Sequence, residues 1–189
     1  NFVKSGFIAT TIIFLGYMWS NPKISTEQLG SHNLARIEMD TQKHQLKLIE
    51  YIEGDFSTLS VIENKKSKSR TLYMNGFSTA TVSDSIGGSD YMQAMGFIPM
   101  VLHPNPKKAM VICFGTGNTT GTVSLFPGVQ VDGIEIDKNV LSLAHHFSKW
   151  NHNAQKKKNI HMYIQDGRTF TRWTQNKYDV ITLEPMSPI

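Results

Sequence analysis

The residues best suited to chemistry surround a glycine-rich turn, Gly115-Thr116-Gly117-Asn118, which follows an apolar run. Glu135 ends a second apolar run further along the chain. A glycine turn between a strand and a helix lets the main chain approach a ligand, and an acid after the next strand can accept hydrogen bonds from two ribose hydroxyls. The pattern predicts a pocket for an adenosine-containing ligand, with these binding residues: Gly115, Thr116, Gly117, Asn118, Glu135 and Ile136.

The glycine spacing narrows the class of ligand. The dinucleotide fingerprint requires a glycine three positions after Gly117, where this chain has Thr120. No Gly-Lys-Ser/Thr follows, so the turn is not a P-loop. An S-adenosyl ligand, whose amino-acid tail the loop would wrap, therefore fits the turn better than NAD.

Two further acidic segments follow later apolar runs, where the carboxyl ends of parallel strands form a ligand crevice. Asp166 and Gly167 come after the first of these runs, and Asp166 is predicted to accept a hydrogen bond from an adenine amine. Glu184 follows the second and precedes Pro185, which makes it the candidate general base or amine-binding group. A plain Asp-Gly turn and a surface carboxylate are the alternative interpretations.

Periodicity predicts the elements that must position these residues. Alternating apolar residues predict antiparallel strands at 45–52, 57–62 and 70–74. Beyond residue 87 the pattern predicts helices at 90–102, 119–126 and 139–150, and strands at 109–114, 129–136, 160–164 and 178–183. Strands that alternate with helices indicate a parallel sheet covered on both faces, so the expected fold class is α/β with a Rossmann-like sheet, cut short after its fourth strand.

The N-terminal segment 1–23 is apolar, carrying no charge between Lys4 and Lys23. Its length is at the short end for a bilayer span, and Tyr17 and Trp19 lie where an interfacial aromatic belt would be. We expect a transmembrane helix at the end of a larger membrane region, with a signal-peptide core or a buried helix as alternatives. The expected organisation is thus a membrane helix at 1–23, a β-strand unit at 34–86 and a nucleoside-binding domain at 87–189.

Composition excludes several classes of protein. The chain has 189 residues and 18% charged residues, which suits one compact domain with an attached segment. Its one cysteine, Cys113, excludes an internal disulfide, and no Cys/His cluster has zinc spacing, so no metal site is expected. The net charge is +4, but the lysines are scattered without interleaved aromatic residues, so no nucleic-acid partner is expected.

A longer series of motifs runs through residues 45–189: Glu53-Gly54, Arg70-x-Leu72, Asn75-Gly76, His103-Pro104-x-Pro106, Gly115-Thr116-Gly117, Glu135-Ile136, Asp166-Gly167-Arg168 and Tyr178-Asp179-Val180-Ile181-x-x-Glu184-Pro185. Their order and spacing resemble the spermidine synthase-like proteins, a family of polyamine aminopropyltransferases, and specifically the branch fused to a transporter-like membrane region. The resemblance also identifies the N-terminal apolar run as the last membrane helix before the transferase domain.

The resemblance implies transfer of an aminopropyl group from decarboxylated S-adenosylmethionine to an amine acceptor such as a polyamine. Glu184 takes the position of the family's aspartate that removes or holds the acceptor's proton. Tyr91 matches the tyrosine that precedes the donor and acceptor contacts, and together with Gln93 it is assigned to substrate binding. The expected location is a membrane with the domain in the cytoplasm, where the donor is made, and a homodimer is left open.

Departures from the family pattern leave donor and acceptor open. Asn118 replaces an acid that suits a donor tail without a carboxylate, so ordinary S-adenosylmethionine is an alternative donor. Gln93 and Ser187 occupy positions where the family has acidic residues, which bind the positive charges of a polyamine. The expected function is therefore a transferase, and the alternatives are an S-adenosylmethionine-dependent methyltransferase and a non-catalytic nucleoside-sensing domain attached to a membrane unit.

Overall fold

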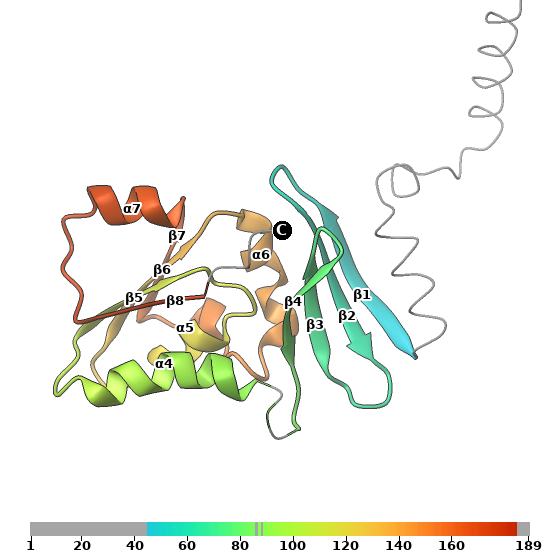
Figure 1. The fold of residues 1–189 in the computed structure, drawn as a ribbon, viewed down its shortest axis with the longest axis horizontal. Coiled ribbons are helices and arrows are strands. Elements are labelled where there is room, and N and C mark those ends of the chain that lie inside the picture. The colour runs from blue at the N-terminus through green and yellow to red at the C-terminus, as the bar shows by residue number, and fades with distance from the viewer. Residues whose placement is uncertain (1–44, 86, 88, 185–189) are drawn as a thin grey trace, which may run out of the picture. The chain divides into compact units, whose positions relative to one another are not determined.

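The computed structural model describes residues 45–85, 87 and 89–184, which contain two four-stranded sheets (Figure 1). The first sheet is antiparallel with the order β1-β2-β3-β4. Its strands are β1 (Leu46–Glu53), β2 (Thr58–Asn64), β3 (Arg70–Met74) and β4 (Phe77–Val82). Alternating apolar residues form these strands because successive side chains point to opposite faces of a sheet.

The second sheet is parallel, with the order β7-β6-β5-β8. Its strands are β5 (Lys108–Ile112), β6 (Gln130–Glu135), β7 (Ile160–Ile164) and β8 (Val180–Leu183). The connecting helices are α4 (Asp90–Leu102), α5 (Asn118–Val123), α6 (Lys138–Leu143), the 3-10 turns η1 (Ala144–Phe147) and η2 (Ala154–Lys156), and α7 (Gly167–Trp173). The chain crosses from β7 past β6 and β5 to β8, as in a Rossmann-like sheet.

Helices cover both faces of the parallel sheet, with α4 and α7 on opposite sides (Figure 1). Ala109 and Val111 of β5 pack with Met100 of α4 in one cluster, whereas Met110 packs with Phe170 of α7 in another. A strand buried on both faces must be apolar at successive positions, which explains the continuous apolar run in β5.

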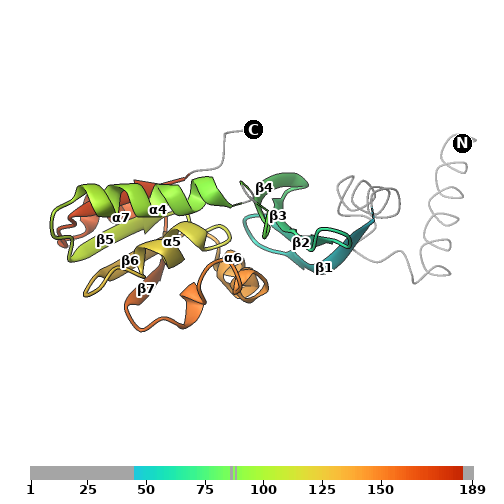
Figure 2. The ribbon, with the colours of Figure 1, turned by 90° about the horizontal axis from the view of Figure 1, so that it is seen from below.

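A third cluster joins the two sheets. Leu59 and Leu72 from the antiparallel sheet pack against Val140 of α6 and Phe147 of η1, all at most 1% exposed. Figure 2 shows α6 beside the antiparallel strands. Polar contacts reinforce this packing, since the Ser57 hydroxyl donates to the buried Asp137 carboxylate at 2.9 Å. The antiparallel sheet is therefore held rigidly against the end of the parallel sheet.

Most of the predicted elements are confirmed, and the helix at 90–102 has the predicted bounds. The other helices differ. The helix predicted at 119–126 ends at Val123, shortly before Pro127, and the one predicted at 139–150 becomes 3-10 after Leu143. Strand β4 and helix α7 were not predicted, because Ser and Thr occupy half of β4 and because α7 has only 7 residues.

The predicted membrane location is corrected by the structure. Across the described part of the chain, no helix has the length and apolar character that a bilayer span requires. The longest of them, α4, has 13 residues, which at 1.5 Å per residue gives about 20 Å against a hydrocarbon core of about 30 Å. The apolar segment 1–23, on which the prediction depended, lies outside the described residues.

Gly121 of α5 sits where the main chain of Asn151 crosses the helix, and a Cβ there would overlap the Asn151 carbonyl group. Backbone cannot move aside cheaply, so we expect Gly121→Ala to lower the free energy of unfolding by roughly 3 kcal/mol, measured by chemical denaturation. The matched control is Gly133→Ala, also buried, where the added Cβ meets only the flexible end of Met162. Equal losses in the two variants would contradict the close backbone approach.

Candidate active site

Strand register brings two acids to one level of the parallel sheet. Ile112 of β5 pairs with Ile134 of β6 on one side and with Leu183 of β8 on the other. The residues that follow, Cys113, Glu135 and Glu184, therefore lie side by side at the carboxyl edge. Burial, followed by the charges of Glu135 and Glu184, raises the pKa of the Cys113 thiol. Both carboxylates thus lie close to Cys113, at the edge of the sheet where Rossmann-like folds bind their ligands.

The glycine turn leaves β5 through three residues with positive φ: Cys113 at 70°, Gly115 at 54° and Gly117 at 83°. Glycine tolerates this region of backbone space, and at Gly117 a Cβ would also overlap the Phe114 ring. The N–H of Gly117 donates to the Phe114 carbonyl at 2.8 Å, which closes the turn. The buried Asn151 amide supports it from behind, donating to the Thr116 carbonyl at 2.9 Å.

Glu135 ties the turn to the neighbouring strand. One carboxylate oxygen accepts from the N–H of Phe114 at 2.9 Å, and the other accepts from the N–H groups of Ile136 and Asp137 at 2.8 and 3.1 Å. The residue is only 7% exposed. Hydrogen bonds from backbone amides compensate the cost of burying a carboxylate, and its remaining lone pairs can accept from ligand hydroxyls. Glu135 therefore combines a structural role with a binding capacity.

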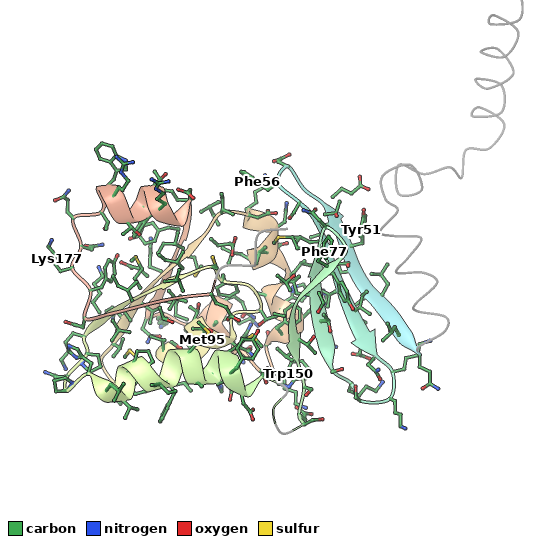
Figure 3. All side chains as sticks on the ribbon, viewed as in Figure 1. Tyr51, Phe56, Phe77, Met95, Trp150 and Lys177 are labelled. Carbon is green, nitrogen blue, oxygen red and sulfur yellow. The ribbon has the colours of Figure 1, made fainter. Side chains whose placement is uncertain are left out.

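A cavity of about 510 Å³ opens beside the turn. Its polar side is formed by the carboxyl edge of the parallel sheet, and its opposite wall by the antiparallel sheet, where Phe77 lies (Figure 3). The lining residues are Leu72, Met74, Phe77, Ser78, Thr79, Ala80, Met92, Cys113, Phe114, Gly115, Thr116, Asn118, Thr119, Glu135, Ile136, Val140 and Glu184. The volume falls within the range of small-molecule sites.

Asn118 lines this cavity with both polar atoms of its amide free. It is 1% exposed, and neither Oδ1 nor Nδ2 has a hydrogen-bond partner among the described residues. A buried amide without partners costs free energy, which a ligand carrying its own donor and acceptor would recover. The amide can donate to a carboxylate and accept from an ammonium, so it is suited to the tail of an amino-acid-like ligand.

Glu184 lines the cavity directly after β8, and its side chain interacts with Tyr91 at the start of α4. Burial, a hydrogen bond with the Glu184 side chain and the charge of that carboxylate raise the pKa of Tyr91 to about 12. The tyrosine hydroxyl is protonated at neutral pH, so it can donate a hydrogen bond to the carboxylate. A carboxylate held in this way can accept a proton from an amine bound in the cavity.

Most of the predicted site residues lie together. Gly115, Thr116, Asn118, Glu135, Ile136 and Glu184 all line the cavity. Gly117 shapes the turn, and Tyr91 reaches the site through Glu184. Gln93, Asp166 and Gly167 are not among the lining residues. Asp166 follows β7 and caps α7, where its carboxylate accepts from the Thr169 N–H at 2.7 Å, so its assignment to the adenine amine stays a prediction.

The sequence did not indicate the apolar wall of the cavity. Leu72, Met74, Phe77 and Ala80 belong to a sheet that precedes the glycine turn, and nothing in their alternation distinguishes a ligand-facing position from a core position. Cys113, which as the one cysteine excludes an internal disulfide, was not predicted as a site residue. Its position between a strand and a glycine turn could have indicated that it lines the site, because the last residues before such a turn lie at the ligand-binding edge of the sheet.

Comparison with known proteins agrees with this geometry. The sequence profile of the family described as "Spermine/spermidine synthase domain" matches residues 89–189. A polyamine aminopropyltransferase of Leptospira biflexa is 29% identical over 144 residues, covering 76% of this chain and 50% of the relative. This chain thus spans about half the length of the curated relatives that it matches.

Solved structures show the same fold. The spermidine synthase of Thermotoga maritima superposes with a TM-score of 0.66 and 24% identity, over 76% of this chain and 48% of that one. A spermidine synthase in complex with the transition-state analogue AdoDATO superposes with a TM-score of 0.67 and 25% identity, over 75% of this chain and 47% of that one. The relatives are named as polyamine aminopropyltransferases and spermidine synthases. These comparisons do not show the predicted fusion to a transporter-like membrane region.

The contact between Tyr91 and Glu184 can be tested by titration. Replacing Glu184 with glutamine removes the negative charge, so we expect the pKa of Tyr91 to fall from about 12 toward its ordinary value of 10.0, although burial still opposes ionisation. Phenolate absorbance against pH, with the Tyr91→Phe variant subtracted, measures this shift. Tyr178, whose pKa is raised to about 12 by burial and by Asp132, is the internal control. An unchanged Tyr91 titration would exclude the contact.

Proposed function

We propose that this chain, which belongs to the spermine/spermidine synthase family, binds an S-adenosyl donor at the carboxyl edge of its parallel sheet and transfers the donor's aminopropyl group to an amine. The observation that carries the proposal is the Glu135 carboxylate bonded to the Phe114 N–H beside the glycine turn. This arrangement presents a carboxylate and close main chain to the same cavity, as a ribose with two free hydroxyls requires.

The donor's parts fit distinct sides of the cavity. The ribose hydroxyls donate to Glu135, and the adenine lies over Ile136, which lines the cavity and is 45% exposed. The amino-acid-like tail reaches Asn118, where its ammonium and any carboxylate satisfy the two free amide atoms. The sulfonium then lies between the glycine turn and Glu184. Asp166, at the end of the next strand, is proposed to accept from the adenine amine.

Transfer follows from the position of Glu184. The nitrogen of a neutral acceptor amine attacks the carbon of the aminopropyl group that is bonded to sulfur, the new C–N bond forms as the C–S bond breaks, and the sulfonium leaves as a neutral thioether. The acceptor nitrogen becomes cationic and loses its proton to the Glu184 carboxylate. The Tyr91 hydroxyl orients that carboxylate, so Tyr91 is a positioning residue.

The wall opposite the sheet edge indicates the class of acceptor. Leu72, Met74, Phe77 and Ala80 offer apolar surface to methylene groups. Among the described residues, the carboxylates that line the cavity are Glu135 and Glu184, and the donor uses the first. A cation needs a nearby opposite charge when it leaves water, so the described site suits an acceptor with one amine bound at Glu184 and an alkyl chain along the apolar wall.

Glu135→Gln tests the donor site. The glutamine NH₂ would face backbone N–H groups that need an acceptor. The substitution also removes the negative charge of the carboxylate to which the ribose hydroxyls are proposed to donate. We expect donor affinity to fall about a hundredfold, because hydrogen bonds to charged groups are lost. Calorimetric titration with 5′-methylthioadenosine, the thioether product, measures the affinity without turnover.

The matched control is Glu184→Gln, the other acid at the same edge of the sheet. It should retain nucleoside binding within about threefold, since a neighbouring charge that makes no contact contributes little, while losing transfer to the amine. Unchanged affinity in Glu135→Gln would refute the donor site. Binding that persists in the unsubstituted protein without any transfer product would favour a nucleoside-sensing domain.

The free amide of Asn118 supports a second candidate, a methyltransferase that uses ordinary S-adenosylmethionine. A neutral amide can bind a tail that carries both an ammonium and a carboxylate, whereas an aspartate would repel the carboxylate. This candidate keeps the same fold and the same contacts to adenosine, and changes only the donor's tail and the group transferred.

Asn118→Asp decides between the two donors. The new carboxylate lies at a position that is 1% exposed, so we expect it to shift the ratio of affinities by at least about tenfold toward decarboxylated S-adenosylmethionine, equivalent to about 1.4 kcal/mol. Affinities of both donors are measured on both proteins. An unchanged ratio would show that the donor's tail does not contact residue 118.

A further inference from the structure

A second cluster of chemically reactive side chains lies away from the cavity, where β1 meets η1. Glu50 belongs to β1, and His145 and His146 are consecutive residues of η1. One ligand atom from each residue lies within 4.8 Å of the other two. The two imidazole rings are adjacent, with centroids 3.9 Å apart. None of these residues lines the cavity, so the cluster requires a separate explanation.

Both histidines direct the same ring nitrogen at one carboxylate oxygen. Nε2 of His146 contacts Oε2 of Glu50, and Nε2 of His145 lies 3.9 Å from that oxygen. At 3.9 Å, beyond hydrogen-bond range, His145 and Glu50 form an ion pair only when the imidazole is protonated. When His145 is neutral, the two nitrogens and one oxygen converge as the ligands of a metal ion do.

The surrounding contacts prepare His145 to act as a ligand, whereas Nε2 of His146 bonds the Glu50 carboxylate and would release its proton to solvent on metal binding. Nδ1 of His145 lies 2.8 Å from the Ser142 carbonyl, to which it can bond only as a donor. The neutral ring therefore carries its proton on Nδ1 and presents a lone pair on Nε2, and this outer hydrogen bond is typical of metal-binding histidines. The main chain at His146 is held as well, since Arg70 donates to its carbonyl at 2.6 Å and also bonds Glu63.

We propose that Glu50, His145 and His146 bind a divalent transition metal ion of the zinc class, with water completing a four-coordinate site. Two imidazole nitrogens and a carboxylate oxygen suit zinc, and nickel or copper would compete for the same ligands. With metal–ligand bonds of about 2.0–2.1 Å, tetrahedral ligand atoms lie about 3.3 Å apart. Side-chain rotations would have to give that spacing on binding, because Nε2 of His146 lies too close to Oε2 of Glu50 and Nε2 of His145 lies 0.6 Å too far from it, and the three atoms lie within 4.8 Å of one another.

The ion would connect the two sheets. Glu50 lies in the antiparallel sheet, and the histidines follow α6 of the parallel part, 96 residues away in the case of His146. Glu50 and the two histidines come together only in the folded chain. Metal binding would therefore stabilise the folded state. This site was not predicted from the sequence, because the expectation of no metal rested on the spacing of Cys and His residues along the chain.

The test uses the full chain without a histidine tag. Titration with zinc chloride in a buffer that does not bind metals, followed by calorimetry, should show one ion bound per chain, and zinc should raise the melting temperature. We expect Glu50→Gln and His145→Ala each to weaken zinc binding at least about tenfold and to reduce the thermal shift. Melting temperatures without zinc report whether the variants still fold.

His161→Ala is the matched control, because His161 is an exposed histidine of β7 outside the cluster. It should bind zinc as the unsubstituted protein does. Zinc binding that survives Glu50→Gln, or that His161→Ala weakens equally, would overturn the proposal. Nucleoside binding is measured on the same samples, so a failed metal site and a failed donor site are distinguished.

Discussion

The bond between the Glu135 carboxylate and the Phe114 N–H is the interaction on which the site depends. The chain leaves β5 with positive φ at Cys113, so the following N–H groups no longer have partners in the sheet. A buried amide without a partner is costly, and the acid from β6 supplies that partner. In return, three amides stabilise a buried carboxylate. The same acid therefore completes the sheet and faces the cavity, which couples folding to ligand binding.

The antiparallel sheet converts this edge into an enclosed site. An open Rossmann-like sheet exposes its crevice to water, and here β3 and β4 supply an apolar wall facing the glycine turn. The wall is held by the core shared with α6 and η1 and by buried bonds such as that from Ser57 to Asp137. Low polarity on this side strengthens electrostatic interactions inside the cavity, including those of Glu135 and Glu184.

Much of the fold and the polar side of the cavity could be predicted from the sequence, for physical reasons that differ between residues. Glu135 and Glu184 follow apolar strands, and parallel strands bring their carboxyl ends to one edge, so their proximity follows from topology alone. Phe77 and Met74 could not be assigned, since their positions depend on how one sheet packs against the other. Glu50 and His146 meet for the same reason, through packing between segments far apart in the chain.

The side chain at residue 118 bears on which donor the pocket would bind, whereas the fold around it suits either donor. The glycine turn, Glu135 and the register of the strands suit either donor equally, because both donors contain the adenosine that these groups are proposed to bind. The donors differ in one carboxylate at the end of the tail, and the side chain proposed to meet this end, that of Asn118, is a buried neutral amide with both polar atoms free. Electrostatics in a desolvated site discriminates strongly between charged and neutral partners. In the proposed site, the fold would therefore provide adenosine recognition, whereas the side chain at residue 118 would discriminate between the two donors.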